Sequence, residues 1–342
     1  MRVNLTSDTA TRPTPAMQRA MWAAEVGDDV FRQDPTVNRL EATAAERFGK
    51  EAALFCPSGT MTNQLAIKCH TRPLDEVLCE EKSHIYQYEG GVYSLLSAVS
   101  VNVLHGERGK LRPGQVTAAV KPPYDWLPRT RLLVLENTCN KGGGSIYTLA
   151  EVQPLLAEAR AAGLACHLDG ARLFNALVET GESPTAWGAA FDTLSVCLSK
   201  GLGAPVGSLL LGPRELVDEA RRYRKVLGGG MRQAGYLAAA GLYALDHHLD
   251  RLREDNARAR RLGRALAPLP YVAAVEPVES NICIFHLREP RTAADLLDRL
   301  AARGVAAVPF GPRTVRLTTH LDVDDAMLDY AIQQLSDPAL LA

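Results

Sequence analysis

Two neighbouring apolar segments of this chain each end in side chains that can do chemistry. The first runs into Cys166-His-Leu-Asp169-Gly-Ala-Arg172, and the second into Val196-Cys-Leu-Ser-Lys200-Gly-Leu-Gly203. A lysine amine condenses with a carbonyl group to form an imine, and a carboxylate keeps a pyridine nitrogen protonated, which is the chemistry of pyridoxal 5′-phosphate. The spacing alone leaves open a solvated lysine in a glycine-rich loop, and an aspartate that caps a helix predicted over 171–178.

Three further residues fit the same kind of site. Gly59 and Thr60 follow an apolar run and open a predicted helix, where backbone N–H groups attract an anion such as phosphate. His84 follows another apolar run, and an imidazole transfers protons near neutral pH. The alternatives are a simple turn from strand to helix at 59–60 and a structural polar side chain at 84.

The elements that must position these side chains alternate along the chain. Short apolar runs separated by helical stretches predict strands at 52–56, 76–79, 99–104, 132–135, 164–168, 193–198 and 208–211. Such alternation predicts an α/β fold with a mostly parallel sheet covered by helices. Functional groups of such sheets gather at the carboxyl ends of the strands, where Asp169 and Lys200 both fall.

The same patterns divide the chain into three regions. Residues 1–50 are predicted to be an N-terminal helical segment, with helices at 15–22 and 36–48. Residues 51–250 form a large cofactor-binding domain, and helical periodicity extends over 213–268. Residues 251–342 form a small α+β C-terminal domain, for which we predict strands at 281–287 and 314–318 and helices at 292–303 and 324–335.

Composition narrows the class of protein. The 342 residues carry a net charge of −1, so no nucleic acid or anionic membrane is expected as a partner. Seven scattered cysteines without a C-x-x-C pair predict neither a disulfide framework nor a metal site, and most of these cysteines are expected to be buried. The N-terminus lacks an apolar signal region, which favours a cytoplasmic protein. His247 and His248 are expected on a solvated helix face.

Several motifs, in this order, resemble the low-specificity L-threonine aldolases, which belong to the β-eliminating lyase group of fold-type-I pyridoxal phosphate enzymes. Besides the two segments already quoted, they are Leu5-Thr-Ser-Asp-Thr-Ala-Thr-Arg-Pro13, Gly27-Asp-Asp-Val-Phe31, Asp34-Pro-Thr-Val37, Pro57-Ser-Gly-Thr-Met-Thr-Asn63, Gly228-Gly-Gly-Met-Arg-Gln233 and Val315-Arg-Leu-Thr-Thr-His320. The resemblance covers the chain almost end to end. It implies an aspartate aminotransferase-like large domain and a small C-terminal domain.

The resemblance also implies roles at the cofactor. Lys200 holds pyridoxal 5′-phosphate as an imine, Asp169 faces the ring nitrogen, and Gly59 and Thr60 bind the phosphate. His84 stacks on the cofactor ring and is the first candidate for the base that takes the substrate's hydroxyl proton.

The other implied roles concern the substrate and a second subunit. Ser7, Arg172 and Arg316 contact the substrate carboxylate, with Arg313 in reserve for Arg316, and Arg172 also lies at the cofactor. Arg232 reaches the active site of a neighbouring subunit near the phosphate. The resemblance therefore implies a homo-oligomer with shared sites, either a dimer or a homotetramer built from dimers.

Three departures from the family pattern bear on specificity. Phe31 stands where members often have tyrosine, Trp126 where many have a second histidine, and Cys139 replaces the histidine of Asn-Thr-His-Asn. Phe31 and Trp126 are nevertheless expected at the substrate. The predicted activity is cleavage of L-threonine or L-allo-threonine to glycine and an aldehyde. An amino-acid racemase or β-eliminating lyase on the same scaffold, and a non-catalytic protein that binds the cofactor or a partner, stay open as alternatives.

Overall fold

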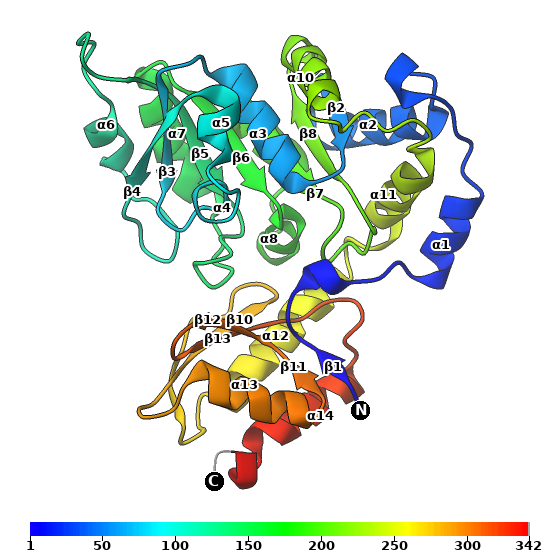
Figure 1. Ribbon diagram of the computed structural model, residues 1–342, viewed down its shortest axis with the longest axis vertical. Helices are drawn as coiled ribbons and strands as arrows, with labels where there is room; N and C mark the ends of the chain where they lie inside the picture. The colour runs from blue at the N-terminus through cyan, green and yellow to red at the C-terminus, as the bar shows by residue number, and fades with distance from the viewer. Residues whose placement is uncertain (341–342) are drawn as a thin grey trace.

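A seven-stranded sheet forms the centre of the larger lobe, at the top of Figure 1. The computed structural model describes residues 1–340, and its sheet has the strand order β2-β8-β7-β6-β5-β3-β4. Only β8 runs antiparallel to its neighbours, β2 and β7, so the predicted mostly parallel sheet is confirmed. The strands are β2 (Ala52–Cys56), β3 (Asp75–Glu80), β4 (Ser100–Leu104), β5 (Arg129–Glu136), β6 (Ala165–Gly170), β7 (Thr193–Cys197) and β8 (Ser208–Gly212).

Helices cover both faces of this sheet because successive strand side chains point to opposite sides. On β2, Leu54 and Cys56 pack with α3 and α10, whereas Ala53 and Phe55 join the large core beneath α2, α7 and α11. The helices of this lobe are α1 (Pro15–Trp22), α2 (Pro35–Phe48), α3 (Gly59–His70), α4 (His84–Gln87), α5 (Val92–Ser97), α6 (Gln115–Ala119), α7 (Leu149–Ala161), α8 (Leu173–Thr180), α9 (Pro184–Ala190), α10 (Arg214–Val226) and α11 (Gly235–His247).

The smaller lobe contains an antiparallel sheet of order β12-β13-β10-β9, with α12, α13 and α14 packed around it (Figure 1). Its elements are α12 (Leu252–Leu266), β9 (Val272–Val275), β10 (Ile282–Leu287), α13 (Ala293–Ala302), β11 (Val305–Ala306), β12 (Val308–Gly311), β13 (Thr314–Thr318), α14 (Asp325–Ser336) and a 3₁₀ turn, η3 (Pro338–Leu340). A small core of Leu262, Phe285, Leu300 and Leu317 lies between sheet and helices.

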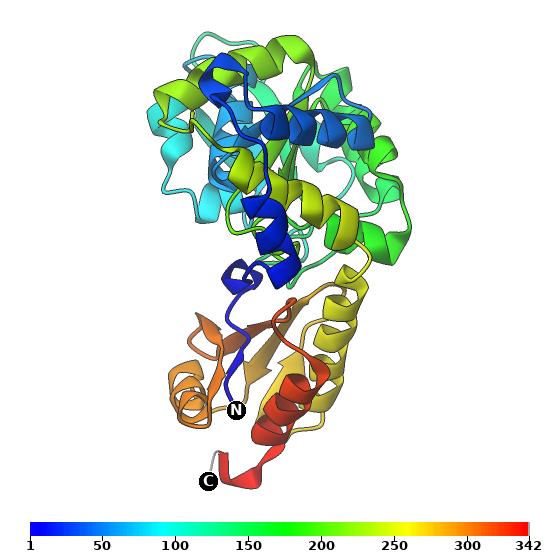
Figure 2. The same cartoon turned by 90° about the vertical axis from the view of Figure 1, so that its right-hand side faces the viewer.

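The N-terminal segment is not wholly helical, because the chain begins in the smaller lobe. Strand β1 (Val3–Asn4) pairs in parallel with β11, and two 3₁₀ turns, η1 (Asp8–Ala10) and η2 (Asp29–Phe31), follow it. From β1 the chain passes between the lobes through η1, then reaches α1 on the larger lobe (Figure 2). The predicted boundaries at residues 50 and 250 stay predictions.

The cysteines and the apolar character of the helices are two further features of the structure. All seven cysteines are free thiols, and all except Cys69 are buried. Within residues 1–340, no helix has both the length and the apolar character needed to cross a bilayer.

Candidate active site

The carboxyl ends of β5, β6 and β7 bring the first group of candidate residues together. Glu136 at the end of β5 is paired in register with Asp169 on β6, and Asp169 is paired with Ser195 on β7. Lys200 follows β7 in a tight turn, in which its carbonyl accepts a hydrogen bond from the Gly203 N–H at 2.9 Å. The predicted Lys200 and Asp169 therefore lie at one edge of the sheet.

His248 supports the turn that carries Lys200, and the prediction of a solvated face is wrong for this residue. Its imidazole is buried, and Nδ1 donates to the carbonyl oxygen of Leu202 at 2.7 Å. The charged neighbours in the sequence suggested exposure, but His248 directly follows α11 and faces the glycine-rich loop, whereas His247 is exposed as predicted.

Asp169 is buried and each of its carboxylate oxygens accepts a hydrogen bond. Oδ2 accepts from the side-chain amide of Asn63 at 2.8 Å, and Oδ1 accepts from the Ala171 N–H at 3.1 Å. Because α8 begins at Leu173, the second bond closes a local turn rather than capping the helix predicted from 171. One oxygen of Asp169 therefore has a local structural role, in the turn with Ala171, while the other oxygen is held by Asn63 of α3.

His84 opens α4 beside these carboxylates. Its Nδ1 lies 2.9 Å from Glu89 Oε1. One side-chain nitrogen or oxygen from each of His84, Glu89 and Asp169 lies within 4.8 Å of the other two. Burial lowers the pKa of His84, but the hydrogen bond to Glu89 and the charges of Asp169, Glu89 and Glu136 outweigh burial, so the net shift is upward. His84 therefore keeps a proton to higher pH than an isolated imidazole.

Glu136 is a site residue that the sequence analysis missed. Its carboxylate accepts the backbone N–H of His84 at 2.7 Å and that of Asn140 at 2.9 Å. Burial and the neighbouring Asp169 raise the pKa of Glu136 to about 7. Its position at the end of β5, the strand next to the one that carries Asp169, could have identified it as a candidate.

Arg172 is buried, and its guanidinium binds Asp8 rather than standing free. Arg172 Nε and Nη2 donate to the two oxygens of Asp8 at 2.6 and 2.7 Å, and the side-chain amide of Asn281 donates to the same carboxylate at 3.0 Å. Burial raises the pKa of Asp8, but the Arg172 charge, the nearby Lys200 and these hydrogen bonds outweigh it and hold the pKa well below its usual range. The predicted Ser7, the residue before Asp8, accepts a hydrogen bond from the Thr9 N–H.

Arg316, on β13 of the smaller lobe, lies in the same cationic region. It is buried, donates to Asn140 Oδ1 at 2.8 Å and to the Thr6 carbonyl at 3.0 Å, and its guanidinium lies over Phe310. Burial and the charge of Arg172 lower the pKa of Arg316 to about 10, and its buried Nε has no partner among the described residues. A buried guanidinium without a carboxylate partner, next to a second cation, is suited to an anionic ligand. The reserve candidate Arg313 instead pairs with exposed Glu289.

Gly59 and Thr60 form the first turn of α3, as predicted. Ser58 caps this helix by accepting the Met61 N–H, which leaves the backbone N–H groups of Gly59 and Thr60 without a recorded partner in residues 1–340. A Cβ at position 59 would lie 2.7 Å from Cys197 Sγ, so only glycine allows α3 to start this close to the end of β7. These unpaired donors fit a phosphate group.

The remaining predicted residues are not brought to this edge within one subunit. Phe31 and Trp126 are 67% and 77% exposed. Arg232 donates to Asp28 at 2.6 Å, and its guanidinium contacts the Phe31 ring. Trp126 stacks on Tyr124 before β5 begins, whereas the site lies where β5 ends. Eight residues of strand, roughly 25 Å, separate the two ends.

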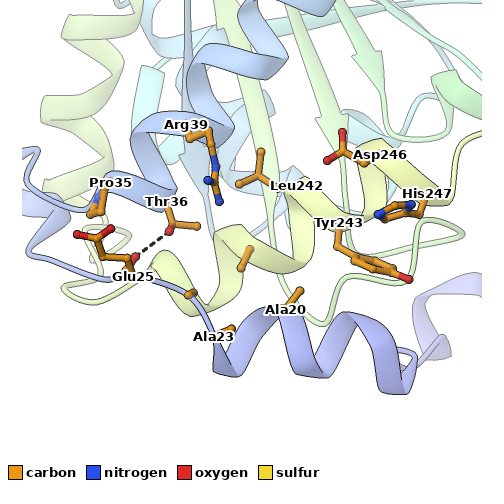
Figure 3. A pocket seen from close by; sticks show the side chains of 12 residues that line it. Ala20, Ala23, Glu25, Pro35, Thr36, Arg39, Leu242, Tyr243, Asp246 and His247 are labelled. Atoms are coloured by element: carbon orange, nitrogen blue, oxygen red, sulfur yellow. Dashed lines mark hydrogen bonds between the residues drawn. The ribbon is translucent and has the colours of Figure 1, made fainter.

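A groove on the larger lobe offers a second concave surface, but none of the residues predicted to bind cofactor or substrate lines it. It lies between α1, α2 and α11, where Arg39, Tyr243 and His247 line it (Figure 3). The hydrogen bond drawn in Figure 3 runs from the Thr36 hydroxyl to the Glu25 carbonyl. The sheet edge is therefore the candidate active site.

The fold and this edge define an α/β enzyme in which a lysine, buried carboxylates and buried arginines meet between two lobes. The β-eliminating lyase family matches residues 4–290, and the chain belongs to that family. It is 41% identical over 329 residues to the low specificity L-threonine aldolase of Escherichia coli K12, covering 95% of this chain and 96% of the relative. It is 40% identical over 337 residues to the probable low-specificity L-threonine aldolase 2 of Arabidopsis thaliana, covering 96% and 95%.

A solved structure supports the same fold. The threonine aldolase of Leishmania major matches with a TM-score of 0.84 at 21% identity, over 99% of this chain and 100% of that chain. The predicted fold-type-I architecture is thereby confirmed, and so is the resemblance to the L-threonine aldolases.

The ion pair of Asp8 and Arg172 leads to a prediction about stability. Asp8→Asn keeps the shape of the side chain but leaves a buried guanidinium without a counter-charge. We expect the free energy of unfolding to fall by about 3–5 kcal/mol, measured by urea denaturation at pH 7. Asp322→Asn, which removes the partner of exposed Arg12, is the matched control and should cost under about 1 kcal/mol.

The same pair predicts a pH dependence for the wild type. The folded pKa of Asp8 lies below its unfolded value, so this carboxylate contributes stability above about pH 4 and loses it as pH falls further. The difference in stability between wild type and Asp8→Asn should therefore shrink below about pH 4. Equal losses for Asp8→Asn and Asp322→Asn at pH 7 would contradict the importance of the buried pair.

Proposed function

We propose that the protein is a pyridoxal 5′-phosphate-dependent aldolase that cleaves L-threonine, L-allo-threonine and related β-hydroxy-α-amino acids to glycine and an aldehyde. The observation that carries the proposal is the meeting of Lys200 and Asp169 with the cationic pair Arg172 and Arg316 at one buried sheet edge. The named activity of relatives about 40% identical over nearly the whole chain supports it.

The residues at this edge fit pyridoxal phosphate at each of its functional groups. Lys200 supplies an amine, Asp169 a buried carboxylate, and Gly59 and Thr60 the backbone N–H groups for a phosphate. When bound, the cofactor supplies an electron sink for a carbanion at the substrate's α carbon. Asp169 serves that chemistry by holding a proton on the ring nitrogen, and the loop closed by His248 keeps Lys200 in place.

The cationic pair is proposed to bind the substrate's carboxylate. Arg316 is the more direct contact, since among residues 1–340 its buried Nε has no partner and neither of its hydrogen bonds goes to a carboxylate. Two donors of Arg172 already bind Asp8, so Arg172 contributes its charge and its remaining Nη1. Ser7 stands next to Asp8 in the sequence and is proposed as the third contact.

His84 is proposed to take the proton of the β-hydroxyl, directly or through a water. With Nδ1 bound to Glu89, its Nε2 is the nitrogen left for the substrate, and the side chain is partly exposed. Cys139 cannot replace it, because burial raises the thiol pKa far above neutrality. As the hydroxyl proton leaves, the Cα–Cβ bond breaks to release the aldehyde, and protonation of the α carbon then gives glycine.

Two alternative hypotheses compete with this proposal. A racemase or β-eliminating lyase would use the same cofactor residues, whereas a non-catalytic binding protein would not need them. Product analysis separates these readings, since only the aldolase forms glycine and an aldehyde from threonine. Retention of Lys200, Asp169, His84 and both buried arginines argues against the non-catalytic reading.

We also propose that the protein acts in the cytoplasm as a homotetramer built from dimers with shared sites. A helix N-terminus carries about half a positive charge, whereas a phosphate carries up to two negative charges, so a further cation is expected there. Arg232 is exposed in one subunit, and a second copy placing its Arg232 at the phosphate would supply that cation. Trp126 reaches a substrate only if another subunit carries it there.

Removal of the Lys200 amine tests the assignment of the cofactor. Lys200→Ala should lose nearly all turnover of threonine and lack the visible absorbance band that borohydride removes from the wild type. Lys68→Ala, at the far end of α3, is the control and should keep both. Wild-type turnover by Lys200→Ala would exclude the proposed function.

Mixing of two inactive variants tests the shared site. Arg232→Ala should impair activity, and mixing it with Lys200→Ala should restore about a quarter of the sites, because one site of each mixed dimer keeps both groups. The measurement is turnover after subunit exchange, with exchange verified by mass spectrometry. An absence of recovery in verified mixed dimers would place Arg232 in its own subunit's site.

Substitution of Trp126 tests whether this residue reaches a substrate. An indole near the β substituent should favour phenylserine over threonine, by about 1–3 kcal/mol of transition-state binding. Trp126→His should reverse that preference and add a titration to the pH–rate profile. Leu95→Ala, another strongly exposed apolar position, serves as the control. An unchanged substrate ratio and pH profile would leave Trp126 outside every active site.

A further inference from the structure

A chain of hydrogen bonds, most of them buried, starts at Asp169. Asn63 Nδ2 donates to Asp169 Oδ2 at 2.8 Å and to Glu89 Oε1 at 2.9 Å. Asn63 Oδ1 lies 3.2 Å from His167 Nε2, and His167 Nδ1 lies 2.9 Å from the hydroxyl of Thr193. That hydroxyl lies 2.9 Å from His70 Nε2, so the chain links α3, β6 and β7.

The direction of every bond in this chain is fixed by the two carboxylates. The Asn63 amide must present its NH₂ to Asp169 and Glu89, since its carbonyl oxygen would be repelled by both. That carbonyl then requires a donor, which is His167 Nε2–H. His167 Nδ1 is left as an acceptor for the single proton of the Thr193 hydroxyl.

His70 completes the chain as a donor. The Thr193 oxygen has given its proton to His167, so it accepts from His70 Nε2–H. This arrangement needs a neutral His167, because its Nδ1 must accept a hydrogen bond, whereas His70 can donate from Nε2 in either protonation state. Burial lowers the pKa of His167 to about 3 and that of His70 to about 4, which favours the neutral forms. Every member thus has one role that agrees with its neighbours.

We propose that Asn63 is a positioning residue whose amide holds the Asp169 carboxylate aimed at the cofactor's ring nitrogen, with that amide held in register by His167 and Thr193. Asp169 needs such a donor because the carboxylates of Glu136 and Glu89 also lie close to it and disfavour a further negative charge. The charge of Asp169 acts on His84, while neutral His167 offers no charge to Asp169.

The neighbouring amide of Gln64 provides a matched comparison on the same helix. Gln64 Nε2 donates to Glu89 Oε2 at 2.5 Å, and its side chain is as buried as that of Asn63. No hydrogen bond joins it to Asp169 in residues 1–340. Loss of the Gln64 amide therefore removes support from Glu89 alone, whereas loss of the Asn63 amide also removes the side-chain donor of Asp169.

The test compares Asn63→Leu, Gln64→Leu and His167→Phe with the wild type by titrating the apoprotein with pyridoxal phosphate between pH 6.5 and 8.5. The measured quantity is the ratio of variant to wild-type Kd, in which the cofactor's own titrations cancel. For Asn63→Leu this ratio should be about tenfold at pH 7.5, or about 1.4 kcal/mol. It should grow as pH falls, because the unsupported carboxylate takes up a proton.

The comparison variants separate positioning from simple structural support. Gln64→Leu should give a Kd ratio near one at every pH. His167→Phe should give a ratio smaller than that of Asn63→Leu, and this ratio should also grow as pH falls. A ratio for Asn63→Leu that is independent of pH, or equal to that of Gln64→Leu, would overturn the inference. If Asn63→Leu does not fold, as judged by circular dichroism, a flat ratio for His167→Phe overturns it.

The inference rests on the proposed cofactor, but the two can fail separately. A wild type that binds no pyridoxal phosphate defeats the proposed function. A wild type that binds it, with Asn63→Leu and Gln64→Leu behaving alike, defeats only the role of Asn63.

Discussion

The buried ion pair between Asp8 and Arg172 is the contact on which the geometry of the site depends. It joins the N-terminal segment to the loop after β6, and Asn281 of the smaller lobe donates to the same carboxylate. Because an unpaired charge in such a position is strongly disfavoured, the three segments must stay together for the fold to persist. Arg316 is then fixed from both sides, by Asn140 of the larger lobe and by the Thr6 carbonyl.

This arrangement separates the charges of the site into two groups. Asp169, Glu136 and Glu89 lie on the side of the sheet edge, while Arg172 and Arg316 lie toward the smaller lobe. The acidic group suits a protonated ring nitrogen and the imidazolium that forms once His84 has taken the hydroxyl proton, and the basic group suits a carboxylate. An amino acid bound between them would have its carboxylate at the arginines and its reacting bonds near His84, which is the orientation that the proposed cleavage requires.

Much of the fold could be predicted because the large sheet is buried on both faces and its strands read as apolar runs. The helix at 15–22 and the strand at 52–56 were predicted with the observed limits. β1 and β11 were missed, since each has two residues and pairs with the opposite end of the chain. The antiparallel direction of β8 depends on the connection through the Lys200 loop, which carries no periodic signal.

The positions of Lys200 and Asp169 at one edge of the sheet could be predicted, because each residue lies where an apolar strand ends. Asp8 and Asn63 lie within quoted motifs, but their partners come from other segments, and sequence spacing does not reveal such contacts. Trp126 was predicted at the substrate from its place in the family pattern, but within its own subunit it lies at the opposite end of β5 from the site. One subunit thus contains the groups proposed to bind the carboxylate and move the proton. If the proposed second copy supplies Arg232 and Trp126, subunit assembly governs substrate preference more than the bond-breaking step itself.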